Sequence, residues 1–198
     1  MQLLSNFGDV AVLLPASLGL IVFLAWFGSR QDAAAYAAAV AACLTAALFI
    51  KLAFAACGGK YSLFGVESPS GHAAFAATFY GCLAALFGAG RTIRWRLALY
   101  GGAAALVLLI GASRVALEAH SAPEVGVGVL IGALSIALFN ALRATPARLG
   151  FNSRIFVRMS PFVVLYALCL LLLADHWTAE PFIDAIAAQI GANMRLCG

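Results

Sequence analysis

Six long apolar runs, separated by short polar segments, constrain this chain of 198 residues more than any other feature. A helix needs about 20 mostly apolar residues to cross the hydrocarbon core of a bilayer, and backbone groups in lipid must be bonded within their own segment. Because 64% of the residues are hydrophobic and 10% are charged, a soluble domain of this length could not bury the apolar surface. The sequence therefore predicts an all-α fold, a single polytopic membrane domain over 1–198 with six transmembrane helices in one bundle, near 10–28, 33–56, 70–89, 97–115, 123–142 and 160–175.

The distribution of lysine and arginine predicts the orientation of the bundle. The loops after the first, third and fifth runs carry eight of these residues, and the opposite side carries four: Lys51, Lys60, Arg114 and Arg195. Cytoplasmic loops are enriched in Lys and Arg, so we expect both termini and the loop after the second run to be extracytoplasmic, in a plasma (inner) membrane. No Lys or Arg precedes the first run, which predicts a retained span rather than a cleavable signal peptide.

The five cysteines show no metal-binding spacing. Cys43, Cys82 and Cys169 lie inside apolar runs and are interpreted as core residues. Cys57 and Cys197 could meet on one side of the membrane, but the odd number of cysteines and their spacing do not favour a disulfide, and that pairing stays open.

Two further patterns concern packing. The apolar residues of 178–194 share one helical face, which predicts an amphipathic helix on the outer interface of the membrane. Gly128 and Gly132 form a small-xxx-small step on the fifth run. Such a step more often packs neighbouring spans of one chain than pairs two chains, so the oligomeric state stays open.

The first polar segment, ESPSGH at 67–72, stands between apolar runs. Its proline suits the first turn of a helix, and Ser68 or Ser70 can cap that helix. Gly71 allows a ligand to approach the backbone closely, and the helix N-terminus attracts anions. Helix capping alone explains the serines but not His72, which can carry a proton near neutral pH.

The second polar segment, SRVALEAHSAPE at 113–124, contains a cation, an imidazole and a carboxylate. Arg114 can hold phosphate oxygens in a bidentate contact. His120 is a competent nucleophile toward phosphorus if a neighbour fixes its tautomer, and Glu124 is the candidate neighbour. Ser121 and Glu124 also match a capping box, and both roles can hold at once. Glu118 is interpreted as a solvated loop residue.

Together the two polar segments contain the parts of a phosphoryl-transfer site. Lys51, Arg114, Ser70 and the Gly71 N–H group would bind phosphate. His120 with Glu124 would supply the nucleophile, and His72 would supply the proton for the leaving group. The sequence shows no carboxylate cluster suited to magnesium or zinc, so we expect no metal or other cofactor, and no nucleic-acid partner.

These residues resemble the motifs of the type-2 phosphatidic acid phosphatases, which are related in site design to the vanadium haloperoxidases. The motif P-S-G-H is intact at 69–72, and S-R-x5-H-x3-D is present at 113–124 with Glu124 in place of aspartate. The motif K-x6-R-P is degenerate, because Lys51 is followed by Gly58-Gly59 where the family has Arg-Pro. Lys60 is a candidate replacement for that arginine in binding phosphate.

The resemblance implies an integral-membrane lipid phosphatase that acts on a lipid phosphate or diphosphate at the outer face, without metal. Undecaprenyl diphosphate, phosphatidic acid and phosphatidylglycerol phosphate are candidate substrates. It implies a phosphohistidine intermediate, with His120 as nucleophile, His72 as acid and Glu124 as orienting group, and phosphate bound by Lys51, Ser70, Gly71 and Arg114. Two alternatives stay open: a phosphotransferase that passes the phosphoryl group to a lipid or sugar acceptor, and a non-catalytic lipid-phosphate binding or transport protein.

Overall fold

The computed structural model describes residues 1–56, 66, 68–143, 153–172 and 186. Within this part the regular structure is helical, with no strand, which confirms the predicted all-α class. The helices are α1 (Gln2–Asn6), α2 (Val10–Phe27), α3 (Arg30–Ala56), α4 (Gly71–Gly88), α5 (Ile93–Ala116), α6 (Ala122–Leu142) and α7 (Ser153–Leu172).

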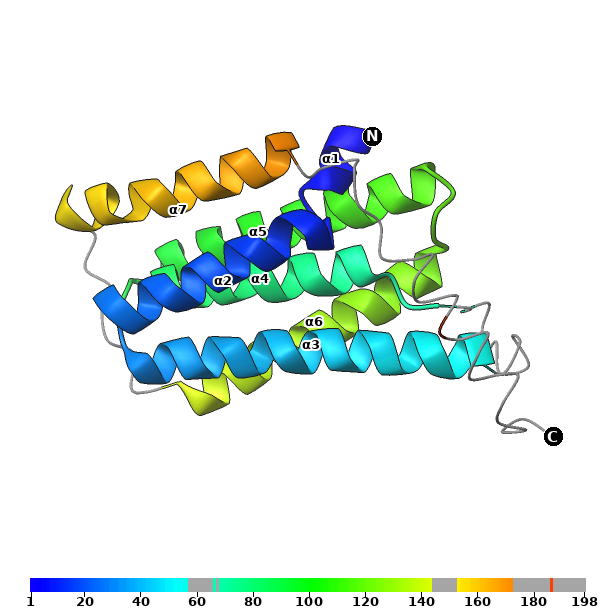
Figure 1. Cartoon of the computed structure of the whole chain (residues 1–198), viewed down its shortest axis with the longest axis horizontal. Coiled ribbons are helices and arrows are strands. Elements are labelled where there is room, and N and C mark those ends of the chain that lie inside the picture. Colours follow the sequence, from blue (N-terminus) through cyan, green and yellow to red (C-terminus); the bar gives the residue numbers. More distant parts are fainter. Residues whose placement is uncertain (57–65, 67, 144–152, 173–185, 187–198) are drawn as a thin grey trace.

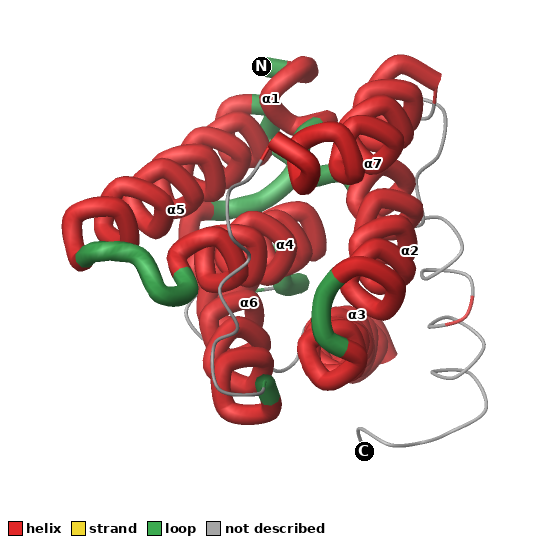
Figure 2. Tube along the Cα trace, turned by 90° about the vertical axis from the view of Figure 1, so that its left-hand side faces the viewer, coloured by secondary structure: helices red, strands yellow, loops and turns green. Residues whose placement is uncertain are grey.

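The long helices alternate in direction along one bundle axis (Figure 1). The ends of α3 and α5 and the starts of α4 and α6 lie at the same end of the bundle, where the N-terminus also lies. Viewed along the bundle, α4 lies among α2, α3, α5 and α6 (Figure 2). Both polar segments predicted from the sequence therefore belong to one end of the bundle.

Within the described residues, five helices are long and apolar enough to cross a membrane: Gln2–Phe27, which joins α1 and α2, Arg30–Phe54, Gly71–Gly88, Ile93–Ala116 and Ala122–Leu142. They correspond to the first five predicted runs. The sixth run falls on α7, whose apolar part, Ser160–Leu172, is shorter than a full span among the described residues. The sixth transmembrane helix therefore stays a prediction, because apolar composition alone does not fix where a helix ends.

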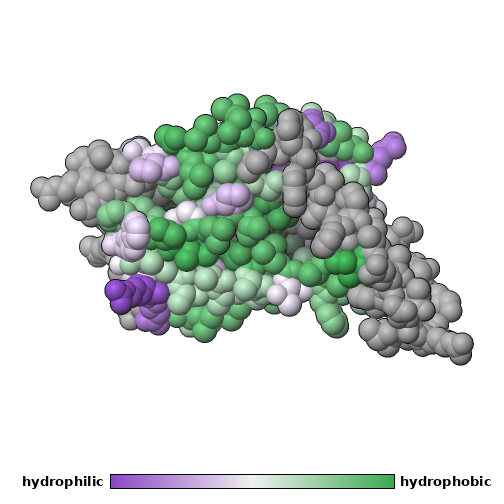
Figure 3. Space-filling model, in the orientation of Figure 1, coloured by the Kyte–Doolittle hydropathy of each residue, from purple (hydrophilic) through white to green (hydrophobic). Residues whose placement is uncertain are grey.

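On the face that Figure 3 shows, apolar side chains cover most of the described surface along the bundle, and the most hydrophilic side chains lie toward its ends. Large side chains such as Phe49, Leu108 and Leu134 are 72%, 65% and 63% exposed. Such a surface is typical of helices that face lipid rather than water. The three cysteines interpreted as core residues, Cys43, Cys82 and Cys169, are buried and free, as predicted.

Three features predicted from the sequence lie outside the described residues. They are Lys60, the pair Cys57 and Cys197, and the amphipathic segment 178–194 apart from residue 186.

Helices α4 and α6 approach closely because glycines of α6 lie against the backbone of α4. A Cβ atom at Gly132 would clash with the Ala77 side chain and lie 2.7 Å from the Ala74 carbonyl oxygen. A Cβ atom at Gly128 would clash with the Ser70 carbonyl oxygen. The small-xxx-small step thus packs two helices of the same chain, as predicted, and it brings the start of α6 against the start of α4.

Replacing Gly132 with alanine is expected to destabilise the protein by about 1–3 kcal/mol, because the added methyl group has no space between the helices. Gly101 is the matched control, since its Cβ position on α5 meets nothing within 4 Å and the residue is exposed. Gly101→Ala should be neutral or slightly stabilising. Thermal unfolding of the purified variants in detergent measures both, and equal midpoints would contradict the packing described.

Candidate active site

The two polar segments meet through the first turn of α6. The Ser68 N–H group donates a hydrogen bond to Glu124 Oε1 at 2.8 Å. The Ser70 N–H group donates to the Glu124 backbone carbonyl at 3.1 Å. The loop that precedes α4 is therefore hydrogen-bonded to Glu124, which the sequence predicted as the orienting acid.

The second carboxylate oxygen of Glu124 contacts the two residues directly before α6. Glu124 Oε2 accepts a hydrogen bond from the Ser121 N–H group at 2.9 Å and lies 3.1 Å from His120 Nδ1. Glu124 is thus a capping-box residue of α6 and the partner of His120 at once, as the sequence predicted. A carboxylate at Nδ1 favours the tautomer that carries its proton there, which leaves the lone pair on Nε2.

The surroundings of His120 favour its neutral form. Its side chain is 5% exposed, and burial lowers the pKa of the imidazole below its ordinary value. The positive charges of Lys51 and Arg114 lower this pKa further, while the hydrogen bond to Glu124 opposes the change. Neutral imidazole is the nucleophilic form, so burial and the two cations favour the state that can attack phosphorus.

The turn after α5 explains the spacing between Arg114 and His120. Glu118 has φ 55°, and the N–H groups of Ala119 and His120 donate to the Arg114 carbonyl oxygen at 3.0 and 3.4 Å. The Glu118 N–H group donates to the Val115 carbonyl oxygen at 3.0 Å. This is a Schellman motif with glutamate at the left-handed position. It reverses the chain after α5, so that the backbone of His120 lies next to the backbone of Arg114. The Glu118 side chain is exposed, as predicted.

Ser113, whose role could not be derived from the sequence, has a structural one here. Its side chain is fully buried, and its hydroxyl donates to the Ile110 carbonyl oxygen at 2.6 Å. This bond lies within the last turns of α5, directly before Arg114.

The start of α4 places Ser70, Gly71 and His72 on its first turn. Ser70 is the N-cap: its hydroxyl oxygen accepts from the Ala73 N–H group at 3.4 Å, and its side chain is buried. Nothing lies within 4 Å of the Cβ position of Gly71, so the backbone there is open on that side. Free N–H groups at an open helix N-terminus suit an anion such as phosphate.

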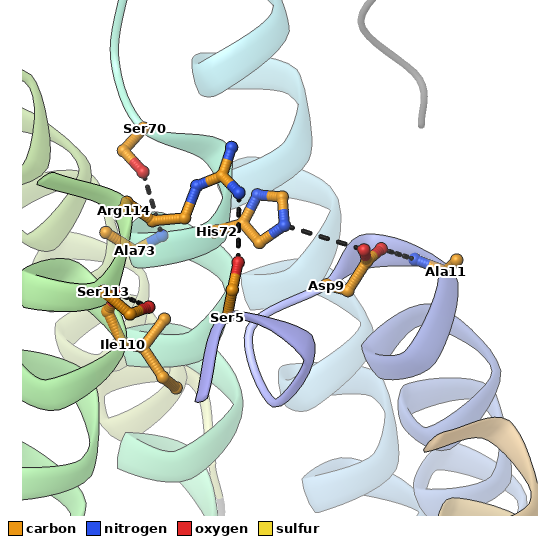
Figure 4. A network of polar contacts seen from close by, with 9 residues as sticks. All are labelled: Ser5, Asp9, Ala11, Ser70, His72, Ala73, Ile110, Ser113 and Arg114. Atoms are coloured by element: carbon orange, nitrogen blue, oxygen red, sulfur yellow. Dashed lines mark hydrogen bonds and ion pairs between the residues drawn. The ribbon is translucent and has the colours of Figure 1, made fainter. Parts of the chain in front are cut away.

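Two residues of the N-terminal segment contact the site, and the sequence had assigned them no role. Arg114 Nη1 donates to Ser5 Oγ at 3.0 Å, and Asp9 Oδ2 lies 3.7 Å from His72 Nε2 (Figure 4). Ser5 is buried although it precedes the first long helix. The signal in the sequence was the presence of polar residues directly before the first apolar run, on the side where the predicted topology places all three histidines.

The predicted phosphate-binding residues are only partly located by the structure. Lys51 lies near the end of α3, partly buried, and its charge acts on His120. Arg114 lies at the end of α5, with Ser5 as its partner. Whether Lys60 replaces the missing arginine stays open, because that residue is outside the described part of the chain.

Comparisons with known proteins agree with the motifs. The family model of the PAP2 superfamily matches residues 33–148, more than half of the chain, and this range contains both polar segments. The "Uncharacterized 22.5 kDa protein in cps region" of Klebsiella pneumoniae is 33% identical over 144 residues, which is 72% of this chain and 68% of that protein. No solved structure shows significant similarity. The chain therefore belongs to the PAP2 superfamily, whose members are phosphatases.

Proposed function

We propose that this protein is a metal-independent lipid phosphatase of the extracytoplasmic face, which hydrolyses a lipid phosphate or diphosphate through a phosphohistidine intermediate. The observation that carries the proposal is the His120–Glu124 pair, with 3.1 Å between Nδ1 and Oε2 and with both side chains buried. A phosphate-binding protein without catalysis needs cations but has no use for an imidazole that a carboxylate holds in one tautomer.

Each proposed role follows from the position of the residue. His120 attacks phosphorus through Nε2, and Glu124 holds the ring and stabilises the positive charge that develops on it. Arg114 and Lys51 bind the phosphate oxygens and offset their negative charge. His72 protonates the oxygen that leaves and later takes a proton from the attacking water.

The N–H groups of the first turn of α4 complete the phosphate site in this scheme. Gly71 is open toward the ligand, and Ser70 keeps the turn in place as its N-cap. Such backbone donors are fixed before the substrate arrives, and fixed donors stabilise developing charge without reorganisation.

A lipid is the substrate class that the surroundings favour. The site lies at the end of a bundle whose sides expose large apolar residues, so an acyl or isoprenyl chain can stay in the bilayer while its phosphate enters the site. The excess of Lys and Arg in the loops at the opposite end favours an extracytoplasmic site. Undecaprenyl diphosphate, phosphatidic acid and phosphatidylglycerol phosphate all satisfy these conditions.

The test is phosphate release by the purified chain from a panel of lipid mono- and diphosphates, in detergent, without added metal and with a chelator. We expect release from at least one lipid, unchanged by the chelator. Radiolabelled phosphoryl groups that appear on an added lipid or sugar acceptor, and not in solution, would show a phosphotransferase instead. Loss of all release with the chelator would contradict the metal-independent mechanism.

A further inference from the structure

The corner between α1 and α2 brings a second carboxylate to the site. Asp9 Oδ2 lies 3.7 Å from His72 Nε2, and the side chains of Asp9 and His72 are 13% and 16% exposed. The other oxygen, Oδ1, accepts a hydrogen bond from the Ala11 N–H group at 2.8 Å and caps α2. Figure 4 shows the His72 ring pointing toward this carboxylate.

Helix capping accounts for only half of this arrangement. An N-cap needs one side-chain oxygen, and serine or asparagine serves as well as aspartate. It gives no reason for a second oxygen, with a full negative charge, to face an imidazole on another helix.

A hydrogen bond from α4 holds the corner in place, and a second bond from α7 holds the side chain that donates it. The Tyr80 hydroxyl, on α4, donates to the Phe7 carbonyl oxygen at 2.8 Å, two residues before Asp9. The Tyr166 hydroxyl, on α7, lies 2.6 Å from the Tyr80 hydroxyl. Because the Tyr80 proton goes to Phe7, Tyr166 is the donor in this second bond. The corner is therefore bonded to the helix that carries His72.

Gly8 allows the corner to approach His72 closely. A Cβ atom at this position would lie 2.7 Å from Ile110 Cγ2 and 3.4 Å from His72 Cβ. A side chain here would push the corner, and Asp9 with it, away from α4 and α5.

The corner also lies outside residues 33–148, which match the PAP2 family model. That range contains both polar segments, but among its described residues no carboxylate forms an ion pair with His72. Asp9, like Ser5, is thus an addition from the N-terminal part of this chain to a site whose proposed catalytic and phosphate-binding residues otherwise come from the matched region or its loops.

We propose that Asp9 is a positioning residue for His72, whose carboxylate orients the imidazole through Nε2 so that Nδ1–H faces the leaving oxygen. This rests on the proposed function. Hydrogen bonds between catalytic groups are often long without substrate and shorten when it binds, which agrees with the separation of 3.7 Å.

The proton balance of the two steps is as follows. As His120 Nε2 bonds to phosphorus, the bond from phosphorus to the leaving oxygen breaks, and His72 Nδ1 gives that oxygen its proton. Water then attacks the phosphohistidine, the phosphorus–nitrogen bond breaks, and His72 takes a proton from the water. Asp9 transfers no proton in either step.

The test compares two phosphate monoesters that differ in the leaving group. The p-nitrophenolate ion leaves readily without protonation, whereas phenolate depends more on a proton donor. Asp9→Asn keeps the cap and the size of the side chain but removes the charge. We expect this variant to lower kcat/KM for phenyl phosphate, which reports formation of the phosphohistidine, by about 10- to 100-fold, part of the effect of a general acid, and to change kcat/KM for p-nitrophenyl phosphate less than about twofold.

Three controls separate positioning from folding. Asp9→Ser is a second variant that keeps the cap, and it should give the same selective loss. His72→Ala lacks the proton donor itself, so its loss for phenyl phosphate relative to p-nitrophenyl phosphate should be at least as large as that of Asp9→Asn. Adding Asp9→Asn to His72→Ala should cause no further loss, because a positioning residue has no effect once its partner is gone.

Equal losses of kcat/KM on both esters would show that Asp9 acts only on structure, and no loss of kcat/KM in either variant would show that it has no role. Either result overturns the proposal for Asp9 and leaves the proposed function standing. Failure of the wild-type chain to release phosphate from both esters and from every lipid of the panel would instead overturn the proposed function.

Discussion

Replacing His120 with alanine is expected to lower phosphate release from every substrate by about 10⁴-fold or more, the size of effect seen when a covalent nucleophile is lost. The buried ring, its lowered pKa and its bond to Glu124 favour the neutral tautomer with a lone pair on Nε2. Among the described residues, His120 is the histidine for which a side-chain hydrogen bond to a carboxylate is found.

A covalent intermediate gives this prediction a second readout. Wild-type protein mixed briefly with a ³²P-labelled substrate and quenched in alkali should retain label, since phosphohistidine survives base and is lost in acid. His120→Ala should retain none. His72→Ala should retain more label than wild type with p-nitrophenyl phosphate, because the group that deprotonates the attacking water is absent.

His176 provides the matched control. It is the third histidine of the chain and belongs to neither polar segment. His176→Ala should release phosphate and retain label as the wild type does. Turnover by His120→Ala within tenfold of wild type would rule out the phosphohistidine mechanism. If wild type binds lipid phosphate but neither releases phosphate nor retains label, a non-catalytic binding role is the better account.

The contacts that could be predicted from the sequence are those that local spacing determines. His120 and Glu124 lie four residues apart across the start of a helix. The sequence therefore predicted both the capping box of Ser121 and Glu124 and the pairing of Glu124 with His120. Ser70 could be predicted as a helix cap because it directly precedes the helix that it caps. Neither inference needed knowledge of how the helices pack.

The contacts that could not be predicted join residues that are distant in sequence. Ser5 and Arg114 are 109 residues apart, and only the packing of α1 against α5 brings them together. Asp9 reaches His72 because the Tyr80 hydroxyl bonds to the corner and Gly8 fits against α5. No periodicity or motif relates these positions.

The left-handed conformation of Glu118 could not be predicted from the sequence, for another physical reason. Left-handed backbone is favourable for glycine and asparagine, so a glutamate with φ 55° gives no signal in the sequence. The Schellman motif that requires this conformation depends on where α5 ends, and residue types there did not define the end.

Replacing Glu124 with glutamine is expected to lower kcat by about 10³- to 10⁴-fold, by analogy with amide substitutions of orienting carboxylates in catalytic triads. Glutamine can still accept from the Ser121 N–H group and so keep the capping box. Its amide cannot satisfy both the remaining N–H donor and the Nδ1 proton of His120 as two carboxylate oxygens do. The thermal midpoint should therefore change little while kcat falls.

Glu118→Gln is the matched control for this substitution, because it removes the same charge from an exposed side chain two residues before His120. Its kcat should stay within about twofold of wild type, since isolated exposed charges contribute little. Turnover by Glu124→Gln near the wild-type rate would show that Glu124 is only a capping residue.

Aspartate at position 124 tests whether the longer acid is matched to this site, because the resembling family has aspartate there. Glu124 spans from the first turn of α6 to three groups: Ser68 N–H on one oxygen, and Ser121 N–H with His120 Nδ1 on the other. Shortening the side chain by one carbon–carbon bond, about 1.5 Å, moves the carboxylate out of reach of at least one of them. Since a misplacement of about 1 Å can cost about 100-fold in rate, we expect Glu124→Asp to lower kcat by about 10- to 100-fold. An aspartate variant as active as wild type, measured with the substrate that the lipid panel identifies, would show that the site tolerates either acid and that the three contacts of Glu124 are not needed together.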